Sequence, residues 1–334
     1  MEQNNQKGQT VKIFHRFLAQ LPFCGKGAII IVFRSMPESL IQGSDLAMKT
    51  GLVLEGGAFR TMFSSGVCDA FLDANVPLPD YTLGVSAGIA YGVSYLSQQK
   101  RRNLKLLMHY ANDRRYMGLR NFADPHNRCY FGLEFAYNTI PNKLVPFDYD
   151  AFEAYPGSAE AVVTDLVSGQ AAYLPVPRRD DKFLLLQATC AIPLLFPPIV
   201  IDGVPYLDGG CADAIPWRHA LEQGCDRLVV VLTRERSYYK KPDRAGAVME
   251  RAFRKYPEFL RTLSDRAERY NQSRAELFAL EREGKVLVIA PESTRGFSRM
   301  ERDTKKLLAM WQHGYFAGHA AADAVHRFWT EPEI

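Results

Sequence analysis

The chain has 334 residues, of which 47% are hydrophobic and 23% are charged, and its formal net charge is +4. This length allows one large domain or a domain with an appendage, and this hydrophobic content excludes an intrinsically disordered protein. The six cysteines include no C-x-x-C pair and no neighbouring set of histidines, so neither a metal site nor a cofactor is expected. Because several cysteines lie among apolar residues, we expect buried thiols in a reducing compartment, and hence a cytoplasmic protein.

Residues 1–47 differ from the rest of the chain. We expect them to be a poorly ordered extension, or to result from a translation start that was assigned too far upstream. Met48 directly precedes the first core strand and would make a natural beginning. The apolar run at 27–33 is too short to span a bilayer and lies too far into the chain for a signal peptide. The alternative is an amphipathic membrane-contacting segment, because residues 11–21 mix basic and apolar side chains.

The first core motif is a glycine-rich loop that follows a short apolar run at 52–54, which indicates a buried strand. Apolar residues at near-helical spacing then predict a helix over 62–74. A strand, a glycine loop and a helix in this order present free backbone amides to an anion. A dinucleotide phosphate loop is the competing interpretation, but Ala58 and Thr61 stand where G-x-G-x-x-G requires glycine.

The second motif is the G-x-S-x-G pentapeptide at residues 84–88, between a predicted strand at 81–83 and a predicted helix at 89–96. This context is typical of a nucleophile elbow, which raises the central Ser86 above the sheet at the positive end of the helix. The glycines let the backbone turn sharply without a Cβ clash. The alternative interpretation is a plain surface turn.

Aromatic residues are frequent between the second motif and the third, over residues 101–150. Core packing explains most of them, and others are candidates to line an apolar slot for an acyl chain. They include Tyr110, Tyr116, Phe122, Tyr130, Phe131, Phe135, Tyr137 and Phe147.

The third motif contains Asp208, which follows a predicted hairpin with its turn at Asp202-Gly203. Two glycines come after Asp208, so the backbone there has close access to its neighbours. This segment alone leaves two interpretations open: a carboxylate held at a strand end, or another Asp-Gly turn.

Together the three motifs resemble the patatin-like phospholipase family over about residues 49–232. The resemblance implies a serine–aspartate dyad without histidine, with Ser86 as the nucleophile and Asp208 as its base. It implies an oxyanion hole of backbone amides, with Arg60 bracing the loop. It also implies a three-layer α/β/α fold around a central, mostly parallel sheet, which alternating short apolar runs and helices favour independently. The motif residues are Gly56, Gly57, Ala58 and Arg60 in the oxyanion loop, Gly84 and Gly88 in the elbow, and Gly209 and Gly210 in the acid motif.

One departure from the family pattern lies in the oxyanion loop, where Ala58 replaces a glycine. An alanine keeps its amide donor, so we expect the loop to tolerate Ala58 if its φ is negative. Thr61 also departs from the pattern, and its β-branch restricts the backbone.

Composition changes after a predicted strand at 228–232. We therefore expect a patatin-like catalytic domain over 48–233 and a basic, mainly helical extension over 234–334 that packs on it. Residues 234–310 contain 19 lysines and arginines against 12 acidic residues. A cationic face suits peripheral contact with an anionic membrane surface, such as the inner face of a membrane, whereas the alternative is a solvated helical cover. No nucleic-acid-binding motif is present, so nucleic acid is not an expected partner.

These observations predict a serine acyl hydrolase of the phospholipase A or lipid esterase type, acting on lipid or phospholipid acyl esters through an acyl-enzyme. An ordinary α/β-hydrolase triad is the nearest rival, because four histidines follow Asp208. A non-catalytic lipid-binding or regulatory protein is the competing function from a different class, and a lipid transacylase is a third possibility. The four histidines are His219, His313, His319 and His326.

Overall fold

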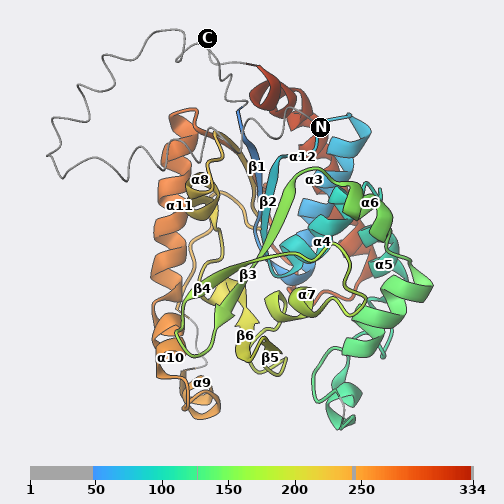
Figure 1. Cartoon of the computed structure of the whole chain (residues 1–334), viewed down its shortest axis with the longest axis vertical. Helices are drawn as coiled ribbons and strands as arrows, with labels where there is room; N and C mark the ends of the chain where they lie inside the picture. The colour runs from blue at the N-terminus through green and yellow to red at the C-terminus, as the bar shows by residue number, and fades with distance from the viewer. Residues whose placement is uncertain (1–47, 126, 243–245, 332–334) are drawn as a thin grey trace, which may run out of the picture. The chain divides into compact units, whose positions relative to one another are not determined.

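A computed structural model describes residues 48–125, 127–242 and 246–331; the expectations for residues 1–47 lie outside this range. Within the described residues, eight strands form one sheet with helices on both faces (Figure 1). The strands are β1 (Thr50–Leu54), β2 (Tyr81–Val85), β3 (Ser158–Asp165), β4 (Ala171–Pro175), β5 (Ile199–Ile201), β6 (Val204–Asp208), β7 (Arg227–Val231) and β8 (Val286–Ile289). The helices are η2 (Ala58–Thr61), α3 (Met62–Asp73), α4 (Ala87–Leu96), α5 (Arg102–Tyr110), η3 (Leu119–Ala123), η4 (Phe135–Leu144), α6 (Tyr149–Ala154), α7 (Leu184–Thr189), η5 (Gly209–Cys211), α8 (Trp217–Glu222), α9 (Gly246–Ala252), α10 (Pro257–Ser264), α11 (Arg266–Arg282) and α12 (Thr304–Thr330).

The sheet has the order β5-β6-β3-β2-β1-β7-β8, and β4 pairs with β3 beside this path. Its central strands, from β3 through β8 in that order, are parallel. The remaining strands, β4, β6 and β5, pair antiparallel. The sheet is therefore mostly parallel, as the sequence predicts.

Side chains of the central strands alternate between two hydrophobic clusters, one on each face of the sheet. Leu52 and Leu54 of β1 belong to the cluster that contains residues of α3, α4 and α12. Val53 belongs to the other cluster, with residues of α8 and α11. Because both faces are covered, β1 is buried along its whole length and its sequence is continuously apolar over 52–54. The predicted three-layer α/β/α fold is confirmed (Figure 1).

The C-terminal region contributes to this sheet as well as covering it. β8 pairs in parallel with β7, so residues on both sides of the predicted boundary at 233/234 share one sheet. The boundary itself stays a prediction. Within this region, residues 246–282 contain three helices, α9, α10 and α11. Among the described helices, none combines the length and the apolar character that crossing a bilayer requires.

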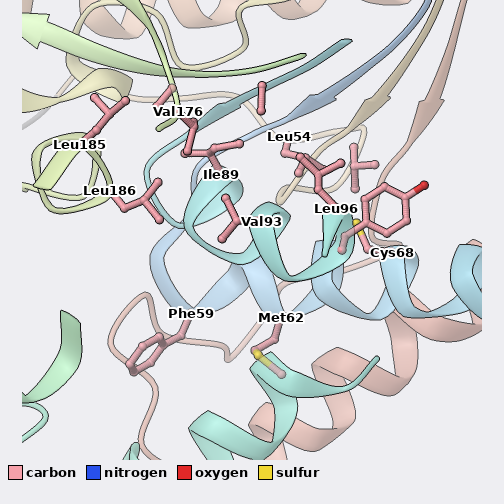
Figure 2. Close-up of a cluster of buried hydrophobic side chains, with 14 of the residues drawn as sticks. Leu54, Phe59, Met62, Cys68, Ile89, Val93, Leu96, Val176, Leu185 and Leu186 are labelled. Carbon is pink, nitrogen blue, oxygen red and sulfur yellow. The ribbon is translucent and has the colours of Figure 1, made fainter. Parts of the chain in front are cut away.

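Helix α4, which follows the G-x-S-x-G motif, is anchored between the sheet and α3. Figure 2 shows Ile89 and Val93 of α4 directed into a group of buried apolar side chains that includes Leu54 and Leu186. Ile89 is fully buried and Val93 is 2% exposed. This packing fixes the position of the helix whose first turn follows Ser86.

Helices α3 and α12 cross at very short range because glycines face each other at the crossing. A Cβ added at Gly314 would lie 1.9 Å from the carbonyl oxygen of Phe63, and one at Gly66 would lie 2.1 Å from that of Trp311. Any side chain there would push the two backbones apart.

We therefore expect Gly314→Ala to lower the free energy of unfolding by about 1–3 kcal/mol, the usual range for overpacking. Chemical denaturation measures the loss. His319→Ala, at an exposed position of the same helix, is the control and should leave stability nearly unchanged. Equal stability of the two variants would contradict the close crossing.

Candidate active site

The sheet register brings the three sequence motifs to one edge. β1 and β2 are parallel, with Leu54 opposite Gly84, so the glycine loop and the elbow leave the sheet side by side. Val85 lies opposite Val162 of β3, and the next residue of β3, Val163, lies opposite Asp208 of β6. Ser86 and Asp208 are therefore neighbours across β3, although 122 residues separate them in sequence.

The elbow around Ser86 is strained and tightly packed. Ser86 has φ 54° and ψ −134°, a conformation that non-glycine residues rarely adopt. A Cβ at Gly88 would lie 2.4 Å from the carbonyl oxygen of Leu54, and one at Gly84 would lie 2.7 Å from the Cβ of Ile89. Both glycines are therefore required by close approach.

Thr189, at the end of α7, holds the elbow in place. The amide of Ser86 donates to Thr189 Oγ1 at 2.8 Å, and this hydroxyl donates to the carbonyl of Val162 at 2.6 Å. The two bonds connect the elbow to β3. Thr189 was not predicted from the sequence, since a threonine in an apolar helix carries no local signal for this role.

The side chains of Ser86 and Asp208 are in direct contact. Ser86 Oγ donates a hydrogen bond to Asp208 Oδ2 at 2.7 Å, and the two residues are 6% and 8% exposed. Asp208 Oδ1 accepts from the amide of Gly210 at 2.8 Å, while Thr164 Oγ1 donates to the Asp208 carbonyl at 2.9 Å. Burial raises the pKa of the Asp208 carboxyl, and the hydrogen bond from Ser86 offsets part of that rise.

The glycine-rich loop packs directly on Ser86. A Cβ at Gly56 would lie 2.9 Å from the Ser86 Cβ, so only glycine lets the loop approach this closely. Within the described residues, the amides of Gly57 and Ala58 donate to no backbone or side-chain acceptor. Gly57 and Ala58 line the same cavity as Ser86.

The conformation of Ala58 differs from the expectation of a negative φ, because its φ is +48°. Here an L side chain is placed in the left-handed region, which costs about 1–2 kcal/mol. The loop keeps this conformation because its neighbours are held on both sides by the contacts of Glu55 and by a bond from the Phe59 amide to the Arg299 carbonyl. Thr61, by contrast, has an ordinary helical φ of −63°.

Because Ala58 has a positive φ, we expect Ala58→Gly to raise the free energy of unfolding by about 0.5–1 kcal/mol. Ala74→Gly is the matched control, at an exposed position with φ −85°, and it should lower stability by a similar amount (~0.5–1 kcal/mol). Denaturant titration of both variants checks the difference. Equal destabilisation by the two substitutions would contradict the assigned backbone of the loop.

Glu55, rather than Arg60, provides the described hydrogen bonds that brace the loop. Glu55 Oε2 accepts from the amide of Thr233 at 2.5 Å, and Oε1 accepts from the Tyr270 hydroxyl at 2.6 Å. Arg60 is 8% exposed and lines the site, and burial together with nearby Arg234 lowers its pKa to about 10. The expected bracing role for Arg60 stays a prediction, whereas Glu55 and Tyr270 were not predicted from the sequence.

Two cavities of different character meet at Ser86. The first has a volume of about 110 Å³ and is mainly apolar. Its lining includes Tyr116, Phe131, Tyr137 and Phe147, four of the aromatic residues singled out in the sequence. The second, of about 90 Å³, is polar and contains Asp208 together with the glycine loop. Ser86, Ala58 and Ile192 line both cavities.

None of the described histidines lines either cavity. His219 stacks on Tyr173 with ring centroids 3.6 Å apart, and its Nε2 lies 3.1 Å from Glu160. His313 packs edge-on against Phe63. His319 and His326 lie on α12. The arrangement gives no support to the rival serine–acid–histidine triad.

Comparisons with known proteins identify two family segments in this chain. The family model of the patatin-like phospholipases matches residues 52–221, and that of a domain of unknown function, DUF6363, matches residues 256–330. The uncharacterized protein YjjU of Escherichia coli is 28% identical over 198 residues, which are 58% of this chain and 54% of that protein. The match thus spans about half of the length of YjjU. The crystal structure of VipD from Legionella pneumophila aligns with a TM-score of 0.42 at 14% identity, over 83% of this chain and 67% of VipD.

The described fold is a mostly parallel α/β sheet with a serine at a sharp strand-to-helix turn. The matched family segment covers just over half of the chain. This chain belongs to the patatin-like phospholipase family, a family of lipid acyl hydrolases.

Proposed function

We propose that this protein is a serine acyl hydrolase that cleaves the ester bond of a lipid, with Ser86 as nucleophile and Asp208 as general base. The observation that carries the proposal is the 2.7 Å hydrogen bond from Ser86 Oγ to Asp208 Oδ2, with Ser86 in the lining of an apolar cavity. Family membership supports the lipid class of the substrate.

In the proposed reaction, Ser86 Oγ attacks the ester carbonyl carbon while its proton passes to Asp208. Negative charge develops on the carbonyl oxygen, and in this proposal the amides of Gly57 and Ala58 donate to it. Collapse of the tetrahedral intermediate breaks the bond to the leaving alcohol, which takes the proton from Asp208. Water then attacks the acyl-serine while Asp208 accepts a proton from it. Collapse of this second intermediate breaks the bond to Ser86 Oγ, which takes the proton back from Asp208, and the fatty acid leaves.

The environment of Asp208 suits this role. An ordinary aspartate, with a pKa of about 3.9, is a weak base at neutral pH. Burial raises the pKa of Asp208, which brings its basicity closer to the working pH. The hydrogen bond to Asp208 Oδ2 already orients the Ser86 hydroxyl toward the proposed base, so little reorganisation precedes the attack.

Intact-mass analysis after treatment with a fluorophosphonate probe tests the nucleophile. The expected result is one covalent adduct on the wild-type protein, formed by Ser86 Oγ with loss of fluoride, and no adduct on Ser86→Ala. Folded wild-type protein that forms no adduct would contradict the proposal and favour a lipid-binding role without catalysis.

A further inference from the structure

The polar cavity beside Ser86 carries more positive charge than the proposed reaction uses. Its lining contains the acids Glu55 and Asp208 and a larger number of basic side chains. Most of these come from the C-terminal region, outside the matched 52–221 segment. The basic residues are Arg60, Arg234, Lys240, Arg266 and Arg299, which we call the cationic cluster.

The two acids in this cavity offset only part of the positive charge of the cluster. Both oxygens of Glu55 accept hydrogen bonds from Thr233 and Tyr270, and Asp208 is bonded to Ser86. Among the ion pairs of the described residues, none includes Arg60, Arg234 or Arg299. The cavity therefore keeps a net positive charge next to the nucleophile.

Two arginine Nε atoms in this lining add a specific requirement for an acceptor. The Nε atoms of Arg60 and Arg234 are buried and donate to no group in the described part of the chain. A buried donor without an acceptor is costly, and more so when it belongs to a charged group. Arg60 as a whole is 8% exposed. Arg234 is fixed by a 2.6 Å bond to Thr294 Oγ1 and lies over the ring of Tyr238, 4.3 Å from its centroid.

We propose that the cationic cluster binds the phosphate of an anionic lipid head group, with the acyl chain in the apolar cavity and the ester at Ser86. This inference rests on the proposed function. Guanidinium groups match phosphate because their forked N–H donors bond two oxygens at once. Ser86 lines both cavities, so a single amphiphilic molecule reaches both from the reaction centre.

The same cavity disfavours a zwitterionic head group such as phosphocholine. A quaternary ammonium binds to carboxylates or to open aromatic faces. The Glu55 carboxylate already accepts hydrogen bonds from Thr233 and Tyr270, and Arg234 already lies over Tyr238. The ring of Tyr270 faces Lys240 and Arg274, at 5.8 and 5.7 Å. The cationic cluster thus favours a head group with a net negative charge over a zwitterionic head group that also contains a phosphodiester.

Arg299 connects head-group binding to the reaction site. Its carbonyl accepts the amide of Phe59 at 3.1 Å, so the segment that presents its side chain is attached to the glycine loop. Its side chain is exposed, so its substitution leaves the core unchanged. Arg295 is also exposed on the same segment but lies outside the cavity lining, which makes it the matched control.

Hydrolysis of short-chain phospholipids below their micellar concentration tests the cluster without a membrane surface. Wild-type protein should show a kcat/KM for dihexanoyl phosphatidic acid at least about tenfold above that for dihexanoyl phosphatidylcholine. Arg299→Gln and Arg234→Gln should each lower that preference about tenfold, the loss expected for one charge-assisted hydrogen bond. Arg295→Gln should retain it. No preference in the wild type, or an unchanged preference in both cavity variants, would overturn the inference.

Two further measurements separate this inference from the proposed function. Hydrolysis of p-nitrophenyl butyrate, which has no head group, reports the ester chemistry alone. A wild-type protein that does not hydrolyse this ester would therefore count against the proposed function. Calorimetric binding of sn-glycerol 3-phosphate reports the cluster alone, and Arg299→Gln should weaken it about tenfold while Arg295→Gln does not. Inorganic phosphate bound as tightly as glycerol phosphate would indicate a free-phosphate site and would overturn assignment to a lipid head group.

Discussion

Ser86→Ala is expected to reduce ester turnover to background, and Asp208→Asn to lower kcat/KM at least about 10³-fold, within the range for loss of a general base. The serine variant lacks the nucleophile. In the wild-type protein Ser86 Oγ lies 2.7 Å from Asp208 Oδ2. The asparagine variant keeps the shape of the aspartate but cannot take the proton from Ser86 Oγ. Turnover of p-nitrophenyl butyrate by purified variants measures both losses.

A matched control separates loss of the base from loss of a buried carboxylate. Asp213 lies five residues after Asp208. Burial likewise raises the pKa of its carboxyl, and this carboxyl accepts a 2.9 Å hydrogen bond from the Tyr173 hydroxyl. We expect Asp213→Asn to retain at least half of the wild-type activity, because Asp213 does not contact Ser86. Circular dichroism and thermal melting should show that Ser86→Ala and Asp208→Asn remain folded. Wild-type activity in either of these two variants would contradict the serine–aspartate assignment.

The secondary structure around the site could be predicted because its signals are local. The run at 52–54 is apolar without a break, since β1 is buried on both faces, and β1 spans Thr50–Leu54. The Asp202-Gly203 turn was predicted from two residues, and both have positive φ in the hairpin between β5 and β6. Each of these features depends on a few adjacent residues.

The contact between Ser86 and Asp208 could not be predicted from the residues alone. It depends on β3 lying between β2 and β6 in one register, and no local pattern specifies that pairing. The resemblance to the patatin-like phospholipase family is what implied that Ser86 and Asp208 act together. The same limit explains why Glu55 was missed, because its partner Tyr270 lies 215 residues away.

The cationic cluster marks a second limit. The sequence shows an excess of basic residues over 234–310 and suggests an outer face for an anionic membrane. Three of these basic residues, Arg234, Arg266 and Arg299, line the polar cavity beside Ser86. These side chains reach the cavity because α11 and the segment before α12 lie close to the glycine loop. Amino-acid composition does not encode that placement. Arg266, for example, donates from Nε to the Gly210 carbonyl at 2.7 Å.

The second large effect expected is an acid limb in the pH profile of kcat/KM. Asp208 accepts a proton only as a carboxylate, so activity is present above its pKa and is lost as the pH falls through it. Burial raises this pKa above the ordinary value of about 3.9, so the loss should begin at a higher pH than for an exposed aspartate. Below the limb, kcat/KM should fall about tenfold per pH unit, as one essential ionisation requires.

Removing a nearby positive charge should move this limb in a known direction. Arg266 and Arg299 both lower the pKa of Asp208, because their charges favour the carboxylate. Arg299→Gln should therefore raise that pKa and shift the acid limb to higher pH, whereas Arg295→Gln should leave it in place. The assay uses p-nitrophenyl butyrate, because a substrate without a phosphate separates this effect from head-group binding. A limb near 6.5, roughly the ordinary pKa of histidine, that does not move in Arg299→Gln would indicate a different base. A shift confined to Arg299→Gln would identify the titrating group as one that shares the cavity with the cationic cluster, and Asp208 is the carboxylate there that contacts Ser86.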